Sequence, residues 1–434
     1  MRIAWRRALD SFWFYPAVLS TVAVVVAEVL IGVDRALAED SFEDVTLLSS
    51  LSAGGSRALL SAIATSVLTV TGTTFSITIS VLATTTSSYG PRLVRNFMSD
   101  RGNQLVLGVF TASFLYSLVV LRAVRSETDD GDAFVPTLAV NGAMLLAVLS
   151  VAVLVYFIHH IADSVQVSTL QRRLRDDLGA VVELLAPAQA GPADVGPQHT
   201  GPQDLPPVRD VVAADRSGYV QRVDVDRLLR LAEASDGLVE CVVRSGDHVA
   251  VGEPVVRLRA HGTFADDGAR GVRAAVTLGD ERTPHQDLEY AVQQLTDMAV
   301  RALSPGTNDP YTAASAFDAL GDGLARLAGR PPVPPGRADA GGTLRVVVPW
   351  PQAEELIAQV LVAVRCYAVD APVALGAALR LVERIARVAE GPTTRSLVRD
   401  EVRALHEAVA RSSLQERDRL GIERRVDEVL TTLA

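Results

Sequence analysis

Residues 134–158 read FVPTLAVNGAMLLAVLSVAVLVYFI, a stretch without a single charged side chain. An α-helix rises about 1.5 Å per residue, so this stretch is long enough to cross a hydrocarbon core of about 30 Å. Three earlier stretches, at 12–33, 58–83 and 105–121, share this length and apolar character. Together they predict an α-helical membrane protein with four transmembrane helices.

The charges that flank these four stretches alternate in sign along the chain. The basic flanks carry Arg2, Arg6, Arg7, Arg92, Arg95, Arg101, Arg172, Arg173 and Arg175, and the acidic loops carry Asp34, Glu39, Asp40, Glu43, Asp44, Glu127, Asp129, Asp130 and Asp132. Because basic loops remain on the cytoplasmic side, we expect both termini in the cytoplasm of a bacterium, with the chain in its cytoplasmic (inner) membrane. A cleaved signal peptide is the alternative for residues 1–38, but the first apolar stretch is too long for one.

Composition excludes several classes of chemistry. All 41 basic residues are arginine, so no lysine is present to form a Schiff base, hold a nucleotide phosphate or carry biotin or lipoate. The net charge of −10 argues against binding of nucleic acid. Cys241 and Cys366 lie far apart and the seven histidines are scattered, so we expect no disulfide, no metal and no cofactor. No catalytic motif is present, and we therefore do not expect an enzyme.

The second apolar stretch is unusually polar, reading TSVLTVTGTTFSITISVLATTTSS over residues 65–88. On a helix, small and hydroxyl side chains fall on one narrow stripe, at Thr65, Thr69, Gly72, Ser76 and Ser80. A second polar patch, at Thr71, Thr74, Thr78 and Thr85, lies roughly opposite. Two interpretations stay open, namely close packing between helices and the lining of a hydrated path in an oligomer.

Three ionisable residues lie within or at the ends of the apolar stretches. Glu28 is near the predicted outer end of the first, where a carboxylate that reaches interfacial water is favoured over an ion or proton site. His159 and His160 follow the fourth stretch, and neighbours on a helix diverge by about 100°. A polar collar at the membrane boundary is therefore favoured over a metal site, with pH sensing as the alternative.

The remainder of the chain has the composition of a soluble α+β region. We expect a four-span domain with a helical extension at 1–185, a Pro- and Gly-rich linker at 186–207, a small β-rich segment at 208–282 and a mostly helical cytoplasmic domain at 283–434. Turn residues Gly246, Asp247 and Gly252 resemble those of barrel-sandwich folds of the biotinyl and lipoyl class. The attachment lysine is missing, so a carrier role is excluded and a structural or interaction module remains.

A compact turn motif lies inside the helical part, at Ser304, Asn308, Asp309 and Pro310. Asp309 is placed to cap a helix that starts with Pro310, because a carboxylate accepts hydrogen bonds from free backbone N–H groups and proline suits the first helical position. Capping and turn formation explain these residues. A contact with a ligand or another subunit is the alternative.

Three stretches together resemble one bacterial family of predicted integral membrane proteins, domain-of-unknown-function family 2254. They are TGTTFSITISVLATTTSSYGPRLVRNFMSDRGNQLVLGVF at 71–110, YFIHHIADSVQ at 156–166 and RALSPGTNDPYTA at 301–313. The resemblance runs over nearly the whole chain. It implies four spans followed by a cytoplasmic domain, and it brings no activity, substrate or catalytic residue with it.

These observations favour an oligomeric ion channel or permeation pathway, lined by the Ser- and Thr-rich second span. Four spans are few for a monomeric transporter, so we expect a homo-oligomer surrounded by membrane lipid. The alternative is a non-transporting membrane scaffold or sensor whose cytoplasmic domain binds a protein partner. An intramembrane enzyme would need a reactive group of residues that the sequence does not contain.

Overall fold

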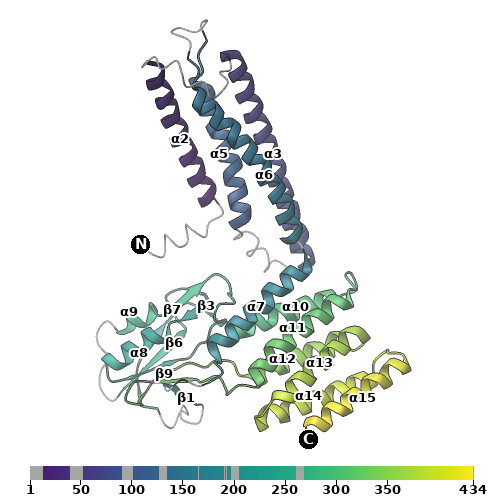
Figure 1. Cartoon of the computed structure of the whole chain (residues 1–434). Coiled ribbons are helices and arrows are strands. Elements are labelled where there is room, and N and C mark those ends of the chain that lie inside the picture. The colour runs from purple at the N-terminus through teal and green to yellow at the C-terminus, as the bar shows by residue number, and fades with distance from the viewer. Residues whose placement is uncertain are drawn as a thin grey trace. The chain divides into compact units, whose positions relative to one another are not determined.

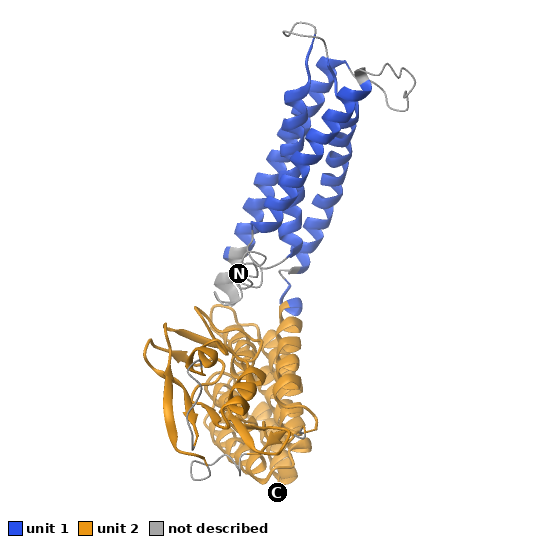
Figure 2. Ribbon diagram, turned by 90° about the vertical axis from the view of Figure 1, so that its left-hand side faces the viewer, with its two compact units in different colours: residues 1–169 blue, residues 170–434 orange. Residues whose placement is uncertain are grey.

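The computed structural model describes residues 13–39, 52–89, 101–126, 134–164, 166–189, 191, 193–196, 205–260 and 268–433. The chain forms two compact units, Met1–Thr169 and Leu170–Ala434, which Figure 2 colours separately. The charged positions at 2–7, 40–44, 92–95 and 127–132, on which much of the expected orientation depends, lie outside the described residues.

The first unit consists of long helices, as predicted. They are α2 (Phe14–Glu39), α3 (Ala53–Tyr89), α5 (Arg101–Ala123) and α6 (Thr137–Ser164), and Figure 1 shows them as a bundle. All four are long and apolar enough to cross a membrane, which confirms the four predicted spans. Helix α5 packs on each of the other three. Half of its span is buried, against about a fifth for each neighbour, so α5 forms the core of the bundle.

Small and hydroxyl residues of α5 let its neighbours approach closely. A Cβ at Gly108 would stand 2.6 Å from Leu19, and one at Gly142 on α6 would stand 2.4 Å from the hydroxyl of Tyr116. Two hydroxyl pairs link helices, Ser20 with Thr111 at 3.1 Å and Ser113 with Ser150 at 3.1 Å. Both of these polar contacts between spans are made by α5, one with α2 and one with α6.

The helical extension after the fourth span differs from the prediction of one continuous domain at 1–185. Helix α6 ends at Ser164, and a separate helix, α7 (Val167–Leu185), follows. From Leu170 onward, α7 belongs to the second unit. Its apolar stripe is buried there, at Leu174, Leu178, Val181, Val182 and Leu185. The packing of this stripe thus moves the boundary to Thr169, because α7 supplies core residues to the second unit.

Two sheets form the β part of the second unit. The larger has the order β1 (Asp194–Val195), β8 (Gly336–Ala338), β9 (Leu344–Val347), β4 (Leu238–Cys241), β6 (Pro254–Arg259), β2 (Val208–Ala213), and the smaller has the order β5 (His248–Val249), β3 (Gly218–Val223), β7 (Val276–Gly279). Only β4 and β9 pair in parallel among the described strands. Helices α8 (Val225–Ala234) and α9 (Gly268–Arg273) complete this part.

The β region extends beyond the predicted segment at 208–282. Strand β1 lies within the predicted linker, and β8 and β9 lie within the domain at 283–434 that was predicted to be mostly, not wholly, helical. Pairing of Val239 with Val346 joins these distant pieces of chain, a non-local contact that local patterning does not reveal. The turn glycines behave as expected, since Gly246 and Gly252 have φ angles of 100° and 87°.

The remaining helices lie in the stretch at 283–434 that the sequence predicts to be mostly helical. They are α10 (Leu288–Ala302), α11 (Pro310–Ala328), α12 (Ala353–Tyr367), α13 (Pro372–Val388), α14 (Pro392–Ala410) and α15 (Glu416–Leu433). Helix α11 packs between α10 and α13, while α14 packs on α12 and α15. Each of these helices buries one apolar stripe, so the helical part of the unit has a continuous core.

Candidate functional site in the membrane helices

The predicted stripe of α3 lies on the outside of its own bundle. Its five members are all exposed, namely Thr65, Thr69, Gly72, Ser76 and Ser80. The buried face of α3 is on the opposite side and carries Leu60, Ile63, Val67, Thr74 and Thr78. The two polar patches therefore differ in their surroundings. The Thr74 and Thr78 patch packs inside the unit, whereas the stripe is exposed among the described residues.

Hydroxyl groups along α3 are satisfied by the backbone of the same helix. Thr69 Oγ1 donates to the carbonyl of Thr65 at 2.9 Å, and Thr73 Oγ1 donates to that of Thr69 at 3.0 Å. Inside the bundle, Thr78 Oγ1 donates to the carbonyl of Thr74 at 2.8 Å. Such bonds let hydroxyl residues stand in apolar surroundings at small cost. A Cβ at Gly72 would meet none of the described atoms within 4 Å, so the backbone is open to approach there.

Glu28 forms an ion pair between two spans. Its Oε1 accepts a hydrogen bond at 2.8 Å from Nη2 of Arg122, in the last turn of α5. The side chains remain 51% and 78% exposed, respectively. Sequence reasoning did not identify Arg122 as the partner, although alternating topology puts the ends of the first and third spans on the same side of a membrane. Glu28 is thus a paired carboxylate within α2, which continues to Glu39, and its contact with interfacial water stays a prediction.

Asp34 is a buried structural carboxylate, which was predicted from the sequence only as a loop charge. It is 8% exposed, and its two carboxylate oxygens each accept a backbone N–H at 3.0 Å, one from Leu138 and one from Ala139. These N–H groups belong to the first turn of α6, which has no partner for them within the helix. Asp34 of α2 therefore caps α6, and this fixes one end of the bundle.

The two histidines at the end of α6 point in different directions, as expected for neighbours on a helix. His159 Nε2 lies 3.3 Å from Asp163 Oδ2, one turn further on, and the ring of His160 stacks on Tyr156 with centroids 5.4 Å apart. Within the described part of the chain, no group of three His, Cys, Asp or Glu residues is arranged to hold a metal ion.

The turn motif of the second unit connects α10 to α11. Asp309 Oδ1 accepts the backbone N–H of Thr312 at 3.0 Å, Oδ2 accepts its hydroxyl at 2.5 Å, and Pro310 begins α11. These hydrogen bonds from Thr312 lower the pKa of Asp309. Ser304 Oγ donates to the carbonyl of Arg301 at 2.7 Å, and Asn308 has a left-handed φ of 45°. Capping and turn formation are thus observed, and any contact with a ligand or subunit stays a prediction.

Comparison with known proteins gives a consistent assignment. A family model described as "Predicted membrane protein (DUF2254)" matches residues 9–384. An uncharacterized protein of Mycobacterium tuberculosis strain H37Rv and one of Mycobacterium bovis are each 33% identical to the chain over 385 residues. These matches cover 87% of this chain and 73% of each relative. No solved structure matches the chain.

Proposed function

Because the chain belongs to the DUF2254 family of predicted membrane proteins, we propose that this four-span integral membrane protein forms an oligomeric path for ions. The subunits would meet around the outward stripe of α3. The observation that carries this proposal is the exposure of Thr65, Thr69, Gly72, Ser76 and Ser80 on the face of α3 opposite to the buried one.

Physical chemistry supports a helix contact at this stripe. Small residues let the backbones of membrane helices approach, and hydroxyl residues add hydrogen bonds between them. On a helix face that contacts only lipid, such residues would not contribute to packing or hydrogen bonding between helices. Several copies of the stripe around one axis would present hydroxyl groups to a central space, which is the kind of lining that a hydrated pore needs.

The proposed oligomer would lie in the cytoplasmic membrane of a bacterium. The basic and acidic flanks support a bacterial cytoplasmic membrane with both termini in the cytoplasm. Membrane lipid would surround the outer helices. No chemical step is proposed, and the protein would act without catalysis, a cofactor or nucleic acid.

Solvent access along α3 tests the proposal. Single cysteines at Thr65, Thr69, Ser76 and Ser80 would be placed in a chain in which Cys241 and Cys366 are serine, and treated in native membranes with a charged thiol reagent. Phe75 and Ile77 are matched controls, because both are exposed large apolar residues at about 100° to either side of the stripe. Val67 on the buried face is a second control.

We expect the reagent to label the cysteines at the stripe positions and to leave those at Phe75, Ile77 and Val67 unlabelled. K⁺ flux from proteoliposomes should then fall when Ser76 is replaced by Phe. Equal protection at every position, together with an absence of K⁺ flux under an applied voltage, would overturn the proposal.

A membrane scaffold or sensor is the second candidate, and the α10–α11 turn favours it. Tyr311 is 72% exposed although the cap needs only Asp309 and Thr312. An exposed aromatic side chain beside a rigid turn is suited to a protein contact. A photo-reactive phenylalanine analogue at position 311 should then cross-link one defined protein, while an analogue at exposed Leu420 on α15 should not. Identical cross-linking patterns at the two positions would contradict this function.

A further inference from the structure

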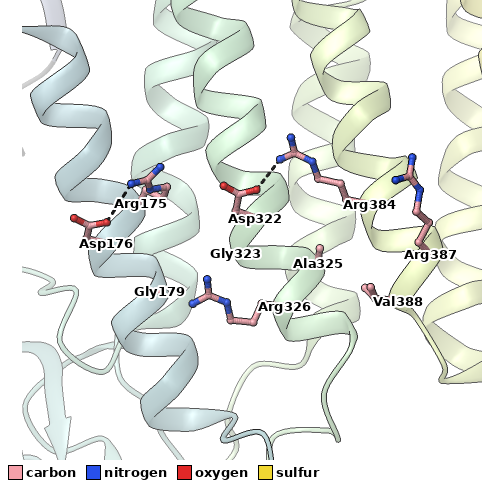
Figure 3. A pocket seen from close by; sticks show the side chains of 10 residues that line it. All are labelled: Arg175, Asp176, Gly179, Asp322, Gly323, Ala325, Arg326, Arg384, Arg387 and Val388. Atoms are coloured by element: carbon pink, nitrogen blue, oxygen red, sulfur yellow. Dashed lines mark hydrogen bonds and ion pairs between the residues drawn. The ribbon is translucent and has the colours of Figure 1, made fainter.

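A groove of about 740 Å³ runs along three helices of the second unit, α7, α11 and α13. Arg175, Arg326, Arg384 and Arg387 line it, and we name it the arginine groove (Figure 3). Asp176 and Asp322 also line it, and Gly179, Gly323, Ala325 and Val388 complete its walls. Each of the three helices contributes at least one of the four guanidinium groups.

Glycine residues explain why arginines from three helices converge here. A Cβ at Gly323 of α11 would stand 2.4 Å from Leu178 of α7, and one at Gly321 would stand 3.2 Å from the backbone of Leu381 of α13. Both neighbours therefore lie unusually close to α11. The short spacing between the helices brings the longer side chains on their outer faces into one groove.

Most of these guanidinium groups are only weakly neutralised. Arg384 is well paired, with Asp322 at 2.7 Å. By contrast, the ion pairs of the other three are longer, at 3.6 Å for Arg175 with Asp176, 3.4 Å for Arg326 with Glu183 and 3.9 Å for Arg387 with Glu383. Two of these carboxylates bind another arginine more tightly, since Arg330 reaches Glu183 and Arg425 reaches Glu383, both at 2.6 Å.

The charges around the groove do not balance. In the part of the chain that the structure describes, ion pairs link seven guanidinium groups to five carboxylates; the arginines are Arg175, Arg326, Arg330, Arg380, Arg384, Arg387 and Arg425, and the acids are Asp176, Glu183, Asp318, Asp322 and Glu383. A sixth carboxylate, Glu428, lines a neighbouring cavity with Arg387 and Arg425, so arginines still outnumber acids. This local excess of positive charge stands in a chain whose net charge is −10. Like charges held together without full neutralisation raise the free energy of the empty groove, and an anion would relieve that repulsion.

We propose that the arginine groove binds a phosphate-bearing anion through Arg175, Arg326 and Arg387. Guanidinium groups match phosphate oxygens in geometry and charge, and several of them can share one phosphate group. The open groove also has room for a substituent beyond the phosphate itself.

Two sources supply this chemistry, the headgroup of an anionic lipid and a soluble phosphate compound. Arg175 follows Asp163, the last residue of the fourth span, by twelve residues, so the chain limits its distance from a membrane surface. The groove can therefore take its phosphate from a lipid headgroup or from a soluble compound. The experiment below distinguishes these two ligands.

Two pairs of variants of the full chain test the groove. Arg175→Gln with Arg387→Gln removes two weakly paired charges, and Arg403→Gln with Arg417→Gln removes two exposed charges outside the groove. Ala325→Glu places an acid in the groove, and Ala325→Gln is its neutral match of the same size. Sodium pyrophosphate would be titrated calorimetrically into the detergent-solubilised protein. Retention of phosphatidylglycerol against phosphatidylcholine would be measured by native mass spectrometry.

We expect saturable pyrophosphate binding to the parent. Its dissociation constant should rise by about tenfold or more in the Arg175→Gln, Arg387→Gln variant and in Ala325→Glu, because losing a charge-assisted hydrogen bond has an effect of this size. The two matched controls should bind like the parent. Selective loss of phosphatidylglycerol retention, without pyrophosphate binding, would identify the lipid headgroup as the ligand. If neither probe distinguishes the groove variants from their controls, while all variants melt at the temperature of the parent, the proposal is wrong.

Discussion

At the scale of single residues, carboxylates in this protein hold helix ends. Asp34 accepts two N–H groups of α6 from a different helix, and Asp309 accepts the N–H and hydroxyl of Thr312 at the start of its own helix. Both remove unpaired donors from a first turn and place negative charge at the positive end of a helix dipole. The two differ in reach, because Asp34 joins two spans whereas Asp309 acts locally.

Loss of the Asp34 carboxylate should destabilise the bundle. Asp34→Ala leaves two backbone donors of α6 without their partner, which costs about 1–3 kcal/mol in the free energy of unfolding. Asp34→Asn keeps one acceptor oxygen and should lie between the parent and Asp34→Ala. Unfolding in mixed micelles with increasing SDS measures both. Asp163→Ala, at an exposed carboxylate of the same bundle, is the control, and an equal effect of the control would contradict this role.

The cap at Asp309 should make stability depend on pH. Hydrogen bonds from Thr312 lower the folded-state pKa of Asp309 below its unfolded value of about 3.9. A lowered folded-state pKa adds stability that is fully present above the unfolded pKa and is lost as pH falls through the folded one. The melting temperature of the parent should therefore exceed that of Asp309→Ala at pH 7, and the gap should narrow below about pH 4. A gap of constant size down to pH 2 would show that the carboxylate charge is not involved.

At the scale of secondary structure, glycine positions set the spacing between helices. Gly108 and Gly142 permit close contacts in the membrane bundle, and Gly321 and Gly323 permit them in the second unit. Glycine is unfavourable inside a helix, by roughly 0.5–1 kcal/mol relative to alanine, so packing has to compensate for it. Gly72 is the contrasting case, because no described atom lies near its Cβ position, and its partner would be another subunit if the proposed oligomer forms.

Gly323→Ala should push α7 away from α11. The added Cβ would meet Leu178 at 2.4 Å, and overpacking of this kind costs about 1–3 kcal/mol. Combining it with Leu178→Ala should cost less than the sum of the two single changes, because the removed side chain makes room. Gly421→Ala in α15 is the matched control, since its Cβ would meet none of the described atoms within 4 Å. Chemical denaturation measures all four variants, and strict additivity would rule out the proposed contact.

At the scale of the whole molecule, the chain divides after Thr169 and each unit has its own core. Helix α7 decides where the division falls. Leu174 and Leu178 are almost completely buried, and Arg330 of the second unit bonds to the carbonyls of Val182 and Ala186. A helix that continues the chain from a membrane span is thus part of the core of the second unit.

A fragment of residues 170–434 should fold alone, whereas a fragment of residues 186–434 should not. The shorter fragment lacks the buried stripe of α7 and would expose the surface of α11 that packs on it. Circular dichroism and thermal melting of both purified fragments measure this difference. If both fragments melt in equally cooperative transitions, the boundary between the two units lies at residue 185 instead.

The sequence by itself determined the features that depend on short stretches of chain. Four spans follow from apolar length, the mostly helical character of residues 283–434 follows from local sequence, and the cap at Asp309 follows from the Asp-Pro pair. The family resemblance could also be recognised from the sequence, because its motifs are continuous stretches of chain. These features need no knowledge of which segments meet.

Only the tertiary structure decided which faces meet and which remain exposed. It turned the α3 stripe outward and Thr74 inward, paired Glu28 with Arg122, and placed Asp34 on α6. It also joined β4 to β9 across a hundred residues and gathered the arginine groove from three helices. Each of these depends on contacts between residues far apart in the chain, and their free energy comes from packing and pairing that local patterns do not encode.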